Sequence, residues 1–311
     1  MRLNPETDAP APAMESRWWR DPFYWGIALL LAAYAVVLAM NMEAYAAGPD
    51  PSGYLNSARL LAIGKIRTEQ RTVPGVDVKG LPPMAFVPYA FRPVGEKQMI
   101  PTYPIGLPLA VIAAAHVTGW NLAPHATMLA MALLGILATA WLGCVLGLPG
   151  KWAWFGAILL GTSPLYLTMS LVLMSDVPAL VCLTCAIAAA WKSRECGLKW
   201  AFVAGVAVAC GVFVRPTNAL AIFPAAMCMG ISWRRWGMFC LGGLPGAVLW
   251  CLYNRAANGH FFETGYGQVA EPIAAQWIPG GWLFYIRWLP VLLTPVVLFA
   301  AALPWLALRG G

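Results

Sequence analysis

The chain consists mainly of long apolar runs separated by short polar segments. The first run, Phe23 to Met40, is unbroken and begins with aromatic residues of the kind that favour a membrane interface. A helix needs about 20 apolar residues to cross the hydrocarbon core of a bilayer. We therefore expect a transmembrane helix here, preceded by a cytoplasmic N-terminal tail at 1–22. A cleaved signal peptide is the alternative, because Ala44-Tyr45-Ala46 resembles a cleavage site.

Seven further apolar runs predict seven more spans. They cover about 126–147, 152–172, 175–191, 200–214, 216–231, 236–253 and 282–308. Positive charge collects in two of the short loops between them, with Lys192, Arg194 and Lys199 in one and Arg234 and Arg235 in the other. Because cytoplasmic loops carry an excess of Lys and Arg, both loops are expected inside. Loops 41–125 and 254–281 then face outward.

Two further helices are expected within the first outer loop. The run from Pro101 to Trp120 cannot cross if the loop charges are assigned as above, so we expect a juxtamembrane or re-entrant helix there. Before it, LNSARLLAIGKI places Leu55, Ala58, Leu61 and Ala62 on one stripe, as in an amphipathic helix on the membrane surface. The pattern therefore predicts an all-α polytopic membrane protein of about eight spans.

Composition narrows the class of protein. Of the 311 residues, 60% are apolar and only 11% are charged, which excludes an ordinary water-soluble domain. The net charge of +7 would suggest a nucleic-acid partner in a soluble protein. Here the positive charge is explained by the excess of Lys and Arg in cytoplasmic loops, so no nucleic-acid partner is expected. We predict one membrane domain at 23–308 in the inner (plasma) membrane, with membrane lipids around it.

The cysteines and histidines give little sign of a disulfide framework or a metal site. All eight cysteines lie in or beside apolar segments. Cys182 and Cys185 have CxxC spacing without a second pair, so buried small side chains are favoured over a metal or redox site. His260 and Glu263 are near neighbours but lack the further ligands that zinc requires. No metal and no cofactor are expected.

Three charged residues at the outer ends of predicted helices are candidates for chemistry. Asp50 precedes Pro51, which suits a helix cap, but it is also a carboxylate fixed above the bilayer where a general base could act. Asp176 begins a span, where an acid offsets the helix dipole, so alone it says little about chemistry. Arg215 ends a span on the outer side, where it either snorkels to lipid phosphates or holds the phosphate of a bound lipid substrate.

Aromatic and polar residues of the outer loops complete the candidate site. The second outer loop, from Tyr253 to Tyr266, contains His260 among aromatic and amide side chains that suit sugar rings. Arg92 and Tyr103 are candidates for the same cavity. Tyr54 in the first loop and Tyr266 in the second complete the candidate substrate-binding set. Gly242-Gly243-Leu244-Pro245-Gly246 has no strand before it, so helix packing or a kink is favoured over a phosphate-binding loop.

Several of these segments together resemble one family, the GT-C glycosyltransferases, in particular the protein mannosyltransferase and lipid A aminoarabinose transferase branch. They are PDPSGYLNSARLLAIGKI, TYPIGLPLAVIAAAHVTGW, SPLYLTMSLVLMSDVPALVCLTCAIAAAW, FVRPTNALAIFP and NGHFFETGY, and they cover most of 23–266 in the family's order. The later spans and outer C-terminal domain of full-length members have no counterpart. We therefore expect a shortened relative or a fragment.

The resemblance implies an extracytoplasmic site that uses a polyprenyl-phosphate sugar donor. It implies that Asp50 is the catalytic base, that Asp176 is the second acid and that Arg215 faces the donor phosphate. The expected function is transfer of a sugar from the lipid-phosphate donor to a hydroxyl of a glycan, lipid or protein acceptor, with inversion at the anomeric carbon. The alternative is a non-catalytic polyprenyl-lipid binding or transport protein, or a pseudoenzyme subunit with the same fold.

Overall fold

The structure is a computed structural model that describes residues 21–43, 48–71, 75, 80–95, 97–266 and 278–293. Most of the predicted N-terminal tail (1–20) and the candidate cleavage motif at 44–46 lie outside these residues. The same is true of 267–277 in the second outer loop and of 294–308 in the last predicted span.

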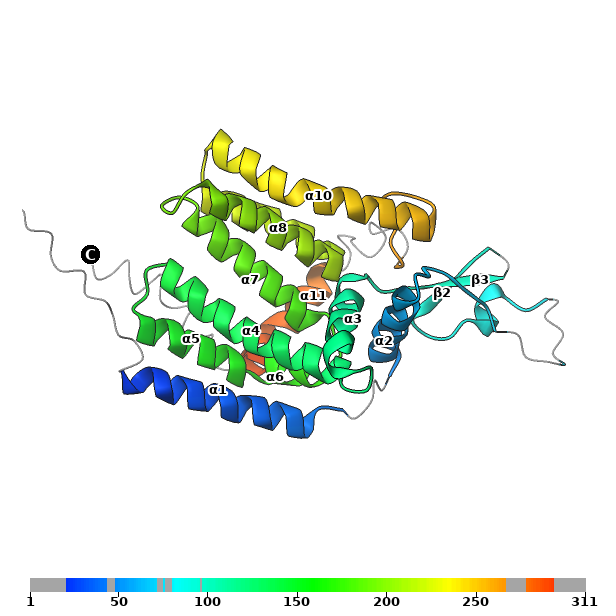
Figure 1. The fold of residues 1–311 in the computed structure, drawn as a ribbon, viewed down its shortest axis with the longest axis horizontal. Coiled ribbons are helices and arrows are strands. Elements are labelled where there is room, and N and C mark those ends of the chain that lie inside the picture. Colours follow the sequence, from blue (N-terminus) through cyan, green and yellow to red (C-terminus); the bar gives the residue numbers. More distant parts are fainter. Residues whose placement is uncertain are drawn as a thin grey trace, which may run out of the picture.

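The described residues are mainly helical (Figure 1). The α-helices are α1 (Pro22–Asn41), α2 (Pro49–Ala62), α3 (Gly106–Thr118), α4 (Ala123–Val145), α5 (Gly150–Thr162), α6 (Pro164–Leu171), α7 (Asp176–Lys192), α8 (Leu198–Val214), α9 (Ile222–Met229), α10 (Trp233–Asn258) and α11 (Ile278–Leu293). Two short 3-10 helices occur at Pro83–Phe86 (η2) and Pro216–Ala221 (η3).

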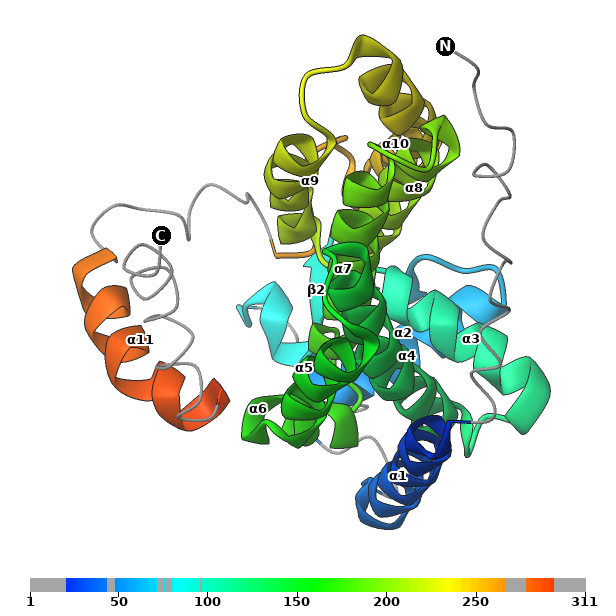
Figure 2. The ribbon, with the colours of Figure 1, turned by 90° about the vertical axis from the view of Figure 1, so that its left-hand side faces the viewer.

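The long helices form a bundle in which α4 is central. Helices α1, α4, α5, α7, α8 and α10 run roughly side by side in Figure 1, and Figure 2 shows the same bundle from one end. About 39% of the most apolar window of α4 is buried, against 11% for α1 and α10. The outer helices therefore turn apolar side chains such as Leu29 and Leu244 away from the protein. Such a surface suits lipid contact.

Within the described part, three helices are long and apolar enough to cross a membrane. They are α1, α4 and α10, and the bent pair α5–α6 makes a fourth if it forms one span. The chain thus has the features of a helical membrane protein. Helices α7 and α8 lie where spans are predicted, but each has only 17 residues. The total of eight spans stays a prediction.

The predicted run 152–172 is broken into two helices. Helices α5 and α6 meet at 62°, with Ser163 as the C-cap of one and the N-cap of the other. Pro164 causes this break because the residue before a proline avoids the helical conformation. The Ser163 hydroxyl then accepts a hydrogen bond from the Tyr166 amide at 3.3 Å, which caps α6.

Glycines bring α8 and α10 into close contact. A side chain at Gly242 would collide with the backbone of Phe202, and one at Gly205 would collide with the backbone of Phe239. Small residues allow helix backbones to approach in this way in membranes. The prediction that Gly242 and Gly243 serve helix packing is therefore confirmed.

The predicted first outer loop contains a small β-sheet that the all-α prediction omits. Strands β1 (Thr68–Glu69), β2 (Phe91–Val94) and β3 (Gln98–Pro101) form an antiparallel sheet in the order β1-β3-β2. The sheet projects beyond α2 at one end of the bundle (Figure 1). It holds the chain that runs from β3 through Tyr103 into α3. The all-α prediction is thus wrong for this segment.

The two helices expected in this loop are present. Helix α3 spans 13 residues of the 101–120 run, and α2 overlaps the predicted amphipathic segment. The buried face of α2 is shifted from the predicted stripe, because Tyr54, Ser57 and Ala58 are buried while Ala62 is exposed.

Candidate functional site

Helix α2 presents Asp50 from its first turn. The N-cap is Gly48, whose φ of 86° favours glycine, and no side chain caps the helix. The interpretation of Asp50 as a capping residue is therefore wrong. Its carboxylate oxygen Oδ1 instead accepts a short hydrogen bond from the Tyr103 hydroxyl. The second carboxylate oxygen makes no hydrogen bond to a described residue.

Tyr103 packs closely against α2 because residue 53 is a glycine. A Cβ atom at Gly53 would lie 2.6 Å from the Tyr103 ring, so only glycine lets the ring approach the helix this closely. The ring stacks on Tyr54 with centroids 4.7 Å apart and meets Tyr266 edge-on at 5.9 Å. Three tyrosines from three separate segments therefore form one aromatic wall beside Asp50.

Tyr54 links this wall to the ends of α7 and α8. Its hydroxyl donates to the Ser175 hydroxyl at 2.9 Å, and the Arg215 Nε donates to the same oxygen at 2.9 Å. Ser175 is almost fully buried. A continuous network of ring and hydrogen-bond contacts thus runs from Asp50 to Arg215.

Arg215 forms a forked ion pair with Asp176. Its Nη1 and Nη2 donate to the two Asp176 carboxylate oxygens at 2.8 and 3.3 Å. Asp176 lies in the first turn of α7 and Arg215 caps the end of α8, so both charges suit the helix dipoles. The side chains remain 41% and 35% exposed. An ion pair this exposed adds at most about 1 kcal/mol to stability. Because both side chains are partly exposed, a ligand can reach them.

Sequence analysis leaves two roles for Arg215: contact with membrane lipid phosphates, or binding of a substrate phosphate. The ion pair determines how many of its N–H donors remain for either role. A guanidinium carries five N–H donors. Three are used here, one on Ser175 and two on Asp176, which leaves two for a ligand. Two N–H groups of Arg215 thus remain for the phosphate that the prediction assigns to it.

The wall tyrosines stay protonated at neutral pH. Burial raises the pKa of Tyr103, and the neighbouring Asp50 carboxylate raises it further by hydrogen bond and charge. Burial also raises the pKa of Tyr54 and Tyr266 above the usual value. Each hydroxyl therefore remains available as a hydrogen-bond donor well above neutral pH.

A second cluster fastens the segment after α10 to the sheet. Arg92 on β2 donates to Glu263 at 2.9 Å and to Asn258 at 2.7 Å. Asn258 in turn donates to the Glu263 carbonyl at 2.7 Å. Arg92 thus holds the segment that carries Tyr266, although it does not reach the aromatic wall through a direct bond.

The structure brings most of the predicted site residues together. Asp50, Tyr54, Tyr103 and Tyr266 meet at the wall, and Tyr54 connects them to Asp176 and Arg215 through Ser175. Arg92 and His260 are the exceptions: Arg92 contacts only the segment that carries Tyr266, and His260 is exposed and has no hydrogen bond to a described residue. Sequence analysis missed Ser175, although this small polar residue directly precedes Asp176 at the start of a span.

A half-open apolar cavity lies near the ion pair, between helices of the bundle. It has a volume of about 300 Å³ and lies between α3, α4, α7 and α8. Pro178 and Val214 line it close to the ion pair, and Cys182 and Cys210 line it further along α7 and α8. The close approach of Gly106 to the end of α8, where an added Cβ would lie 2.6 Å from the Phe213 backbone, forms one wall. The site therefore has a polar ion pair and, near it, an apolar cavity.

All eight cysteines are free thiols. Within the described ranges, no three His, Cys, Asp or Glu side chains gather where they could hold a metal ion.

No family model, curated protein or solved structure matches the chain.

Proposed function

We propose that the protein transfers a sugar from a polyprenyl-phosphate donor to an acceptor hydroxyl at the outer face of the membrane. The observation that carries this proposal is the network from Asp50 to Arg215 and Asp176 beside an apolar cavity. A charged lipid substrate needs both parts: a cation for its phosphate and an apolar path for its tail. The family resemblance in the sequence supports the same function.

The proposed reaction assigns one role to each end of the network. The donor phosphate takes the two free N–H groups of Arg215, and the isoprenoid tail enters the cavity beside Pro178 and Val214. The unpaired oxygen of Asp50 accepts the proton of the acceptor hydroxyl as its oxygen bonds to the anomeric carbon. The bond from that carbon to the phosphate oxygen breaks, and its electron pair leaves with the phosphate. Arg215 stabilises this leaving group.

Tyr103 and Asp176 act as positioning residues in this scheme. The Tyr103 hydroxyl fixes one oxygen of Asp50, so that the other points to the acceptor. Asp176 fixes the guanidinium plane of Arg215. Displacement in one step from the side opposite the phosphate inverts the anomeric carbon.

The function requires the topology that the sequence predicts: eight spans in the inner membrane, with the site outside. The arrangement supports it, since α2, the sheet and the end of α10 gather at one end of the bundle (Figure 1). The end of α7 at Lys192 and the turn to α8, which carries Arg194, lie at the other end (Figure 1).

The test is sugar transfer in membranes that contain the protein, supplied with polyprenyl-phosphate sugars bearing a radiolabelled hexose or pentose. We expect labelled product and released polyprenyl phosphate with the native chain. Asp50→Asn should reduce the rate about 10²–10⁴-fold, because an amide is too weak a base. Glu69→Gln, which neutralises an exposed carboxylate on β1, is the matched control and should retain the native rate.

Two results would overturn the proposal. Native turnover in Asp50→Asn would remove the base from the mechanism. Tight donor binding without transfer of any sugar in the panel would favour the alternative of a lipid-binding or transport protein.

A further inference from the structure

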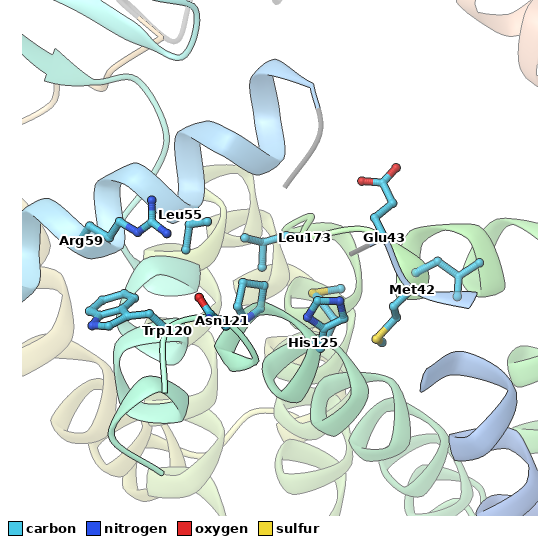
Figure 3. Close-up of a pocket in the computed structure, with 11 residues that line it drawn as sticks. Met42, Glu43, Leu55, Arg59, Trp120, Asn121, His125 and Leu173 are labelled. Atoms are coloured by element: carbon cyan, nitrogen blue, oxygen red, sulfur yellow. The ribbon is translucent and has the colours of Figure 1, made fainter. Parts of the chain in front are cut away.

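A second cavity lies on the other side of α2 from Asp50. Its volume is about 180 Å³, and it lies between α2, the segment after α1, the end of α6 and the corner between α3 and α4 (Figure 3). Arg59 lines it and is nine residues from Asp50, which is two and a half turns of helix. The two side chains therefore leave opposite faces of α2, and this cavity is separate from the site described above.

The polar groups of this cavity lack protein partners. Glu43, Arg59, Asn121 and His125 line it, and none of them makes a hydrogen bond or ion pair with a described residue. The Nδ1 atom of His125 is buried and still unpaired. Buried polar atoms are nearly always paired in folded proteins, with protein or with water. Glu43, Arg59 and Asn121 are exposed and can bind water, so the buried Nδ1 of His125 is the group that a ligand would complete.

The charges of the cavity argue against a charged ligand. Arg59 lies on α2 and Glu43 lies just after α1, so the lining carries one cation and one anion at opposite ends (Figure 3). A phosphate would meet Glu43, and an amine would meet Arg59. A neutral ligand rich in hydroxyl groups meets no such repulsion, because each hydroxyl both donates and accepts.

The remaining lining points to a sugar ring. Asn121 and His125 offer directional hydrogen bonds, and Trp120 offers an indole against which the apolar C–H face of a pyranose packs (Figure 3). The volume of about 180 Å³ gives room for one monosaccharide ring.

A wider recess continues from this cavity past Arg59 and Trp120. It measures about 640 Å³ and is lined mainly by apolar side chains, with Ile63, Ile112 and Ala115 among them. It gives room for whatever is attached to the ring, either the next sugar of a glycan or the alkyl part of a glycolipid.

We propose that the cavity between Glu43, Arg59 and His125 is a binding subsite for a neutral pyranose ring of a glycan or glycolipid. The proposal goes beyond the proposed transfer reaction and does not require it, since the site uses the opposite face of α2. A chain that binds sugar here without transferring any would still satisfy it.

The test is saturation-transfer-difference NMR on the full chain in nanodiscs. The free-sugar probes are the methyl glycosides of glucose, mannose, galactose and N-acetylglucosamine, and the glycolipid probe is octyl β-glucoside below its micellar concentration. We expect saturation of ring protons in at least one probe. Asn121→Leu and Arg59→Met should weaken its apparent Kd at least tenfold.

Two control variants separate this site from the rest of the outer region. Arg71→Met removes an exposed arginine that does not line the cavity and should bind as the native chain does. Asp50→Asn should also bind normally, which distinguishes this subsite from the proposed catalytic site. Thermal unfolding of each variant checks its fold, and His125→Gln replaces Asn121→Leu if the latter unfolds.

The two kinds of probe distinguish the sources of the sugar, and several results would contradict the proposal. Saturation of ring protons in the methyl glycosides identifies a free glycan as the source, and saturation only in the octyl probe identifies a glycolipid. No ring saturation in any probe, saturation confined to the alkyl chain, or equal binding in the cavity variants would overturn the proposal. Loss of binding in Asp50→Asn would place the sugar at the catalytic site instead.

Discussion

At the scale of single residues, the central contact is the hydrogen bond from Tyr103 to Asp50. The other carboxylate oxygen has no partner among the described residues, and the same tyrosine packs on Tyr54, which connects to Ser175 and Arg215. A change at Tyr103 therefore acts on the geometry of the base without removing the base itself.

We expect Tyr103→Phe to lower kcat about tenfold or more and to leave donor KM nearly unchanged. A hydrogen bond to a charged group contributes about 1.5–3 kcal/mol, and about 1.4 kcal/mol corresponds to a factor of ten. Transfer kinetics with varied donor concentration provide the measurement. Tyr89→Phe, at a tyrosine that is 87% exposed, is the matched control. A raised KM with native kcat would place Tyr103 in donor binding.

Arg215 gives the second residue-scale prediction. We expect Arg215→Ala to weaken binding of a polyprenyl-phosphate analogue by about 1.5–3 kcal/mol, the range for a charge-assisted bond. Arg215→Lys should recover only part of this, because a lysine lacks the planar fork. Binding of the analogue in nanodiscs measures the effect, with acceptor affinity as the internal control. Equal affinity in all three chains would reduce Arg215 to the structural partner of Asp176.

Charged residues at the ends of apolar runs were the part of the site that the sequence made visible. Asp50, Asp176 and Arg215 stand out because charge is costly near a membrane interior. Ser175 carries no such signal, since a lone serine is compatible with many positions. The bond between Arg92 and Glu263 joins residues 171 positions apart, so no local pattern encodes it.

At the scale of elements, glycines decide how closely α8 and α10 pack. Gly242 faces the backbone of α8, whereas Gly237, five residues earlier on the same helix, has open space around it. The two positions form a natural pair for comparison.

We expect Gly242→Leu to lower the stability of the protein by about 1–3 kcal/mol or more, because the helices must separate to admit the side chain. Gly237→Leu should be neutral or slightly stabilising, since leucine favours helix over glycine. Thermal unfolding of the purified variants in one detergent compares them. A lower melting temperature for Gly237→Leu than for Gly242→Leu would contradict this account of the interface.

The helices were predictable as elements, but the strands were not. Apolar runs long enough for a helix mark α1, α4 and α10. The strands have only two or four residues, and Pro93 and Pro101 interrupt any alternating pattern. The bend between α5 and α6 depends on Pro164, which membrane helices often tolerate without breaking.

At the scale of the whole molecule, the number and direction of the spans determine on which side the site works. Among the residues that the structure describes, three or four helices meet the length and hydropathy requirements for crossing, while α7 and α8 are short. The ends of the apolar runs can be located from the sequence. Which short helices cross the membrane cannot, because packing against neighbouring helices and the tilt of each helix decide this.

We expect an introduced cysteine at position 195 to react with a membrane-impermeant reagent only after the membrane is opened. One at position 69 should react from outside in intact cells. Both belong in a background without the native cysteines, where labelling yields are compared before and after permeabilisation. Labelling of position 195 from outside would reverse the predicted topology.

The most direct measurement is a cryo-EM structure of the chain in nanodiscs with a non-transferable polyprenyl-phosphate sugar analogue. The account predicts phosphate density within hydrogen-bond distance of Arg215, the sugar between that phosphate and Asp50, and tail density beside Pro178 and Val214. Bound analogue with its phosphate away from Arg215, or with its sugar out of reach of Asp50, would contradict the account.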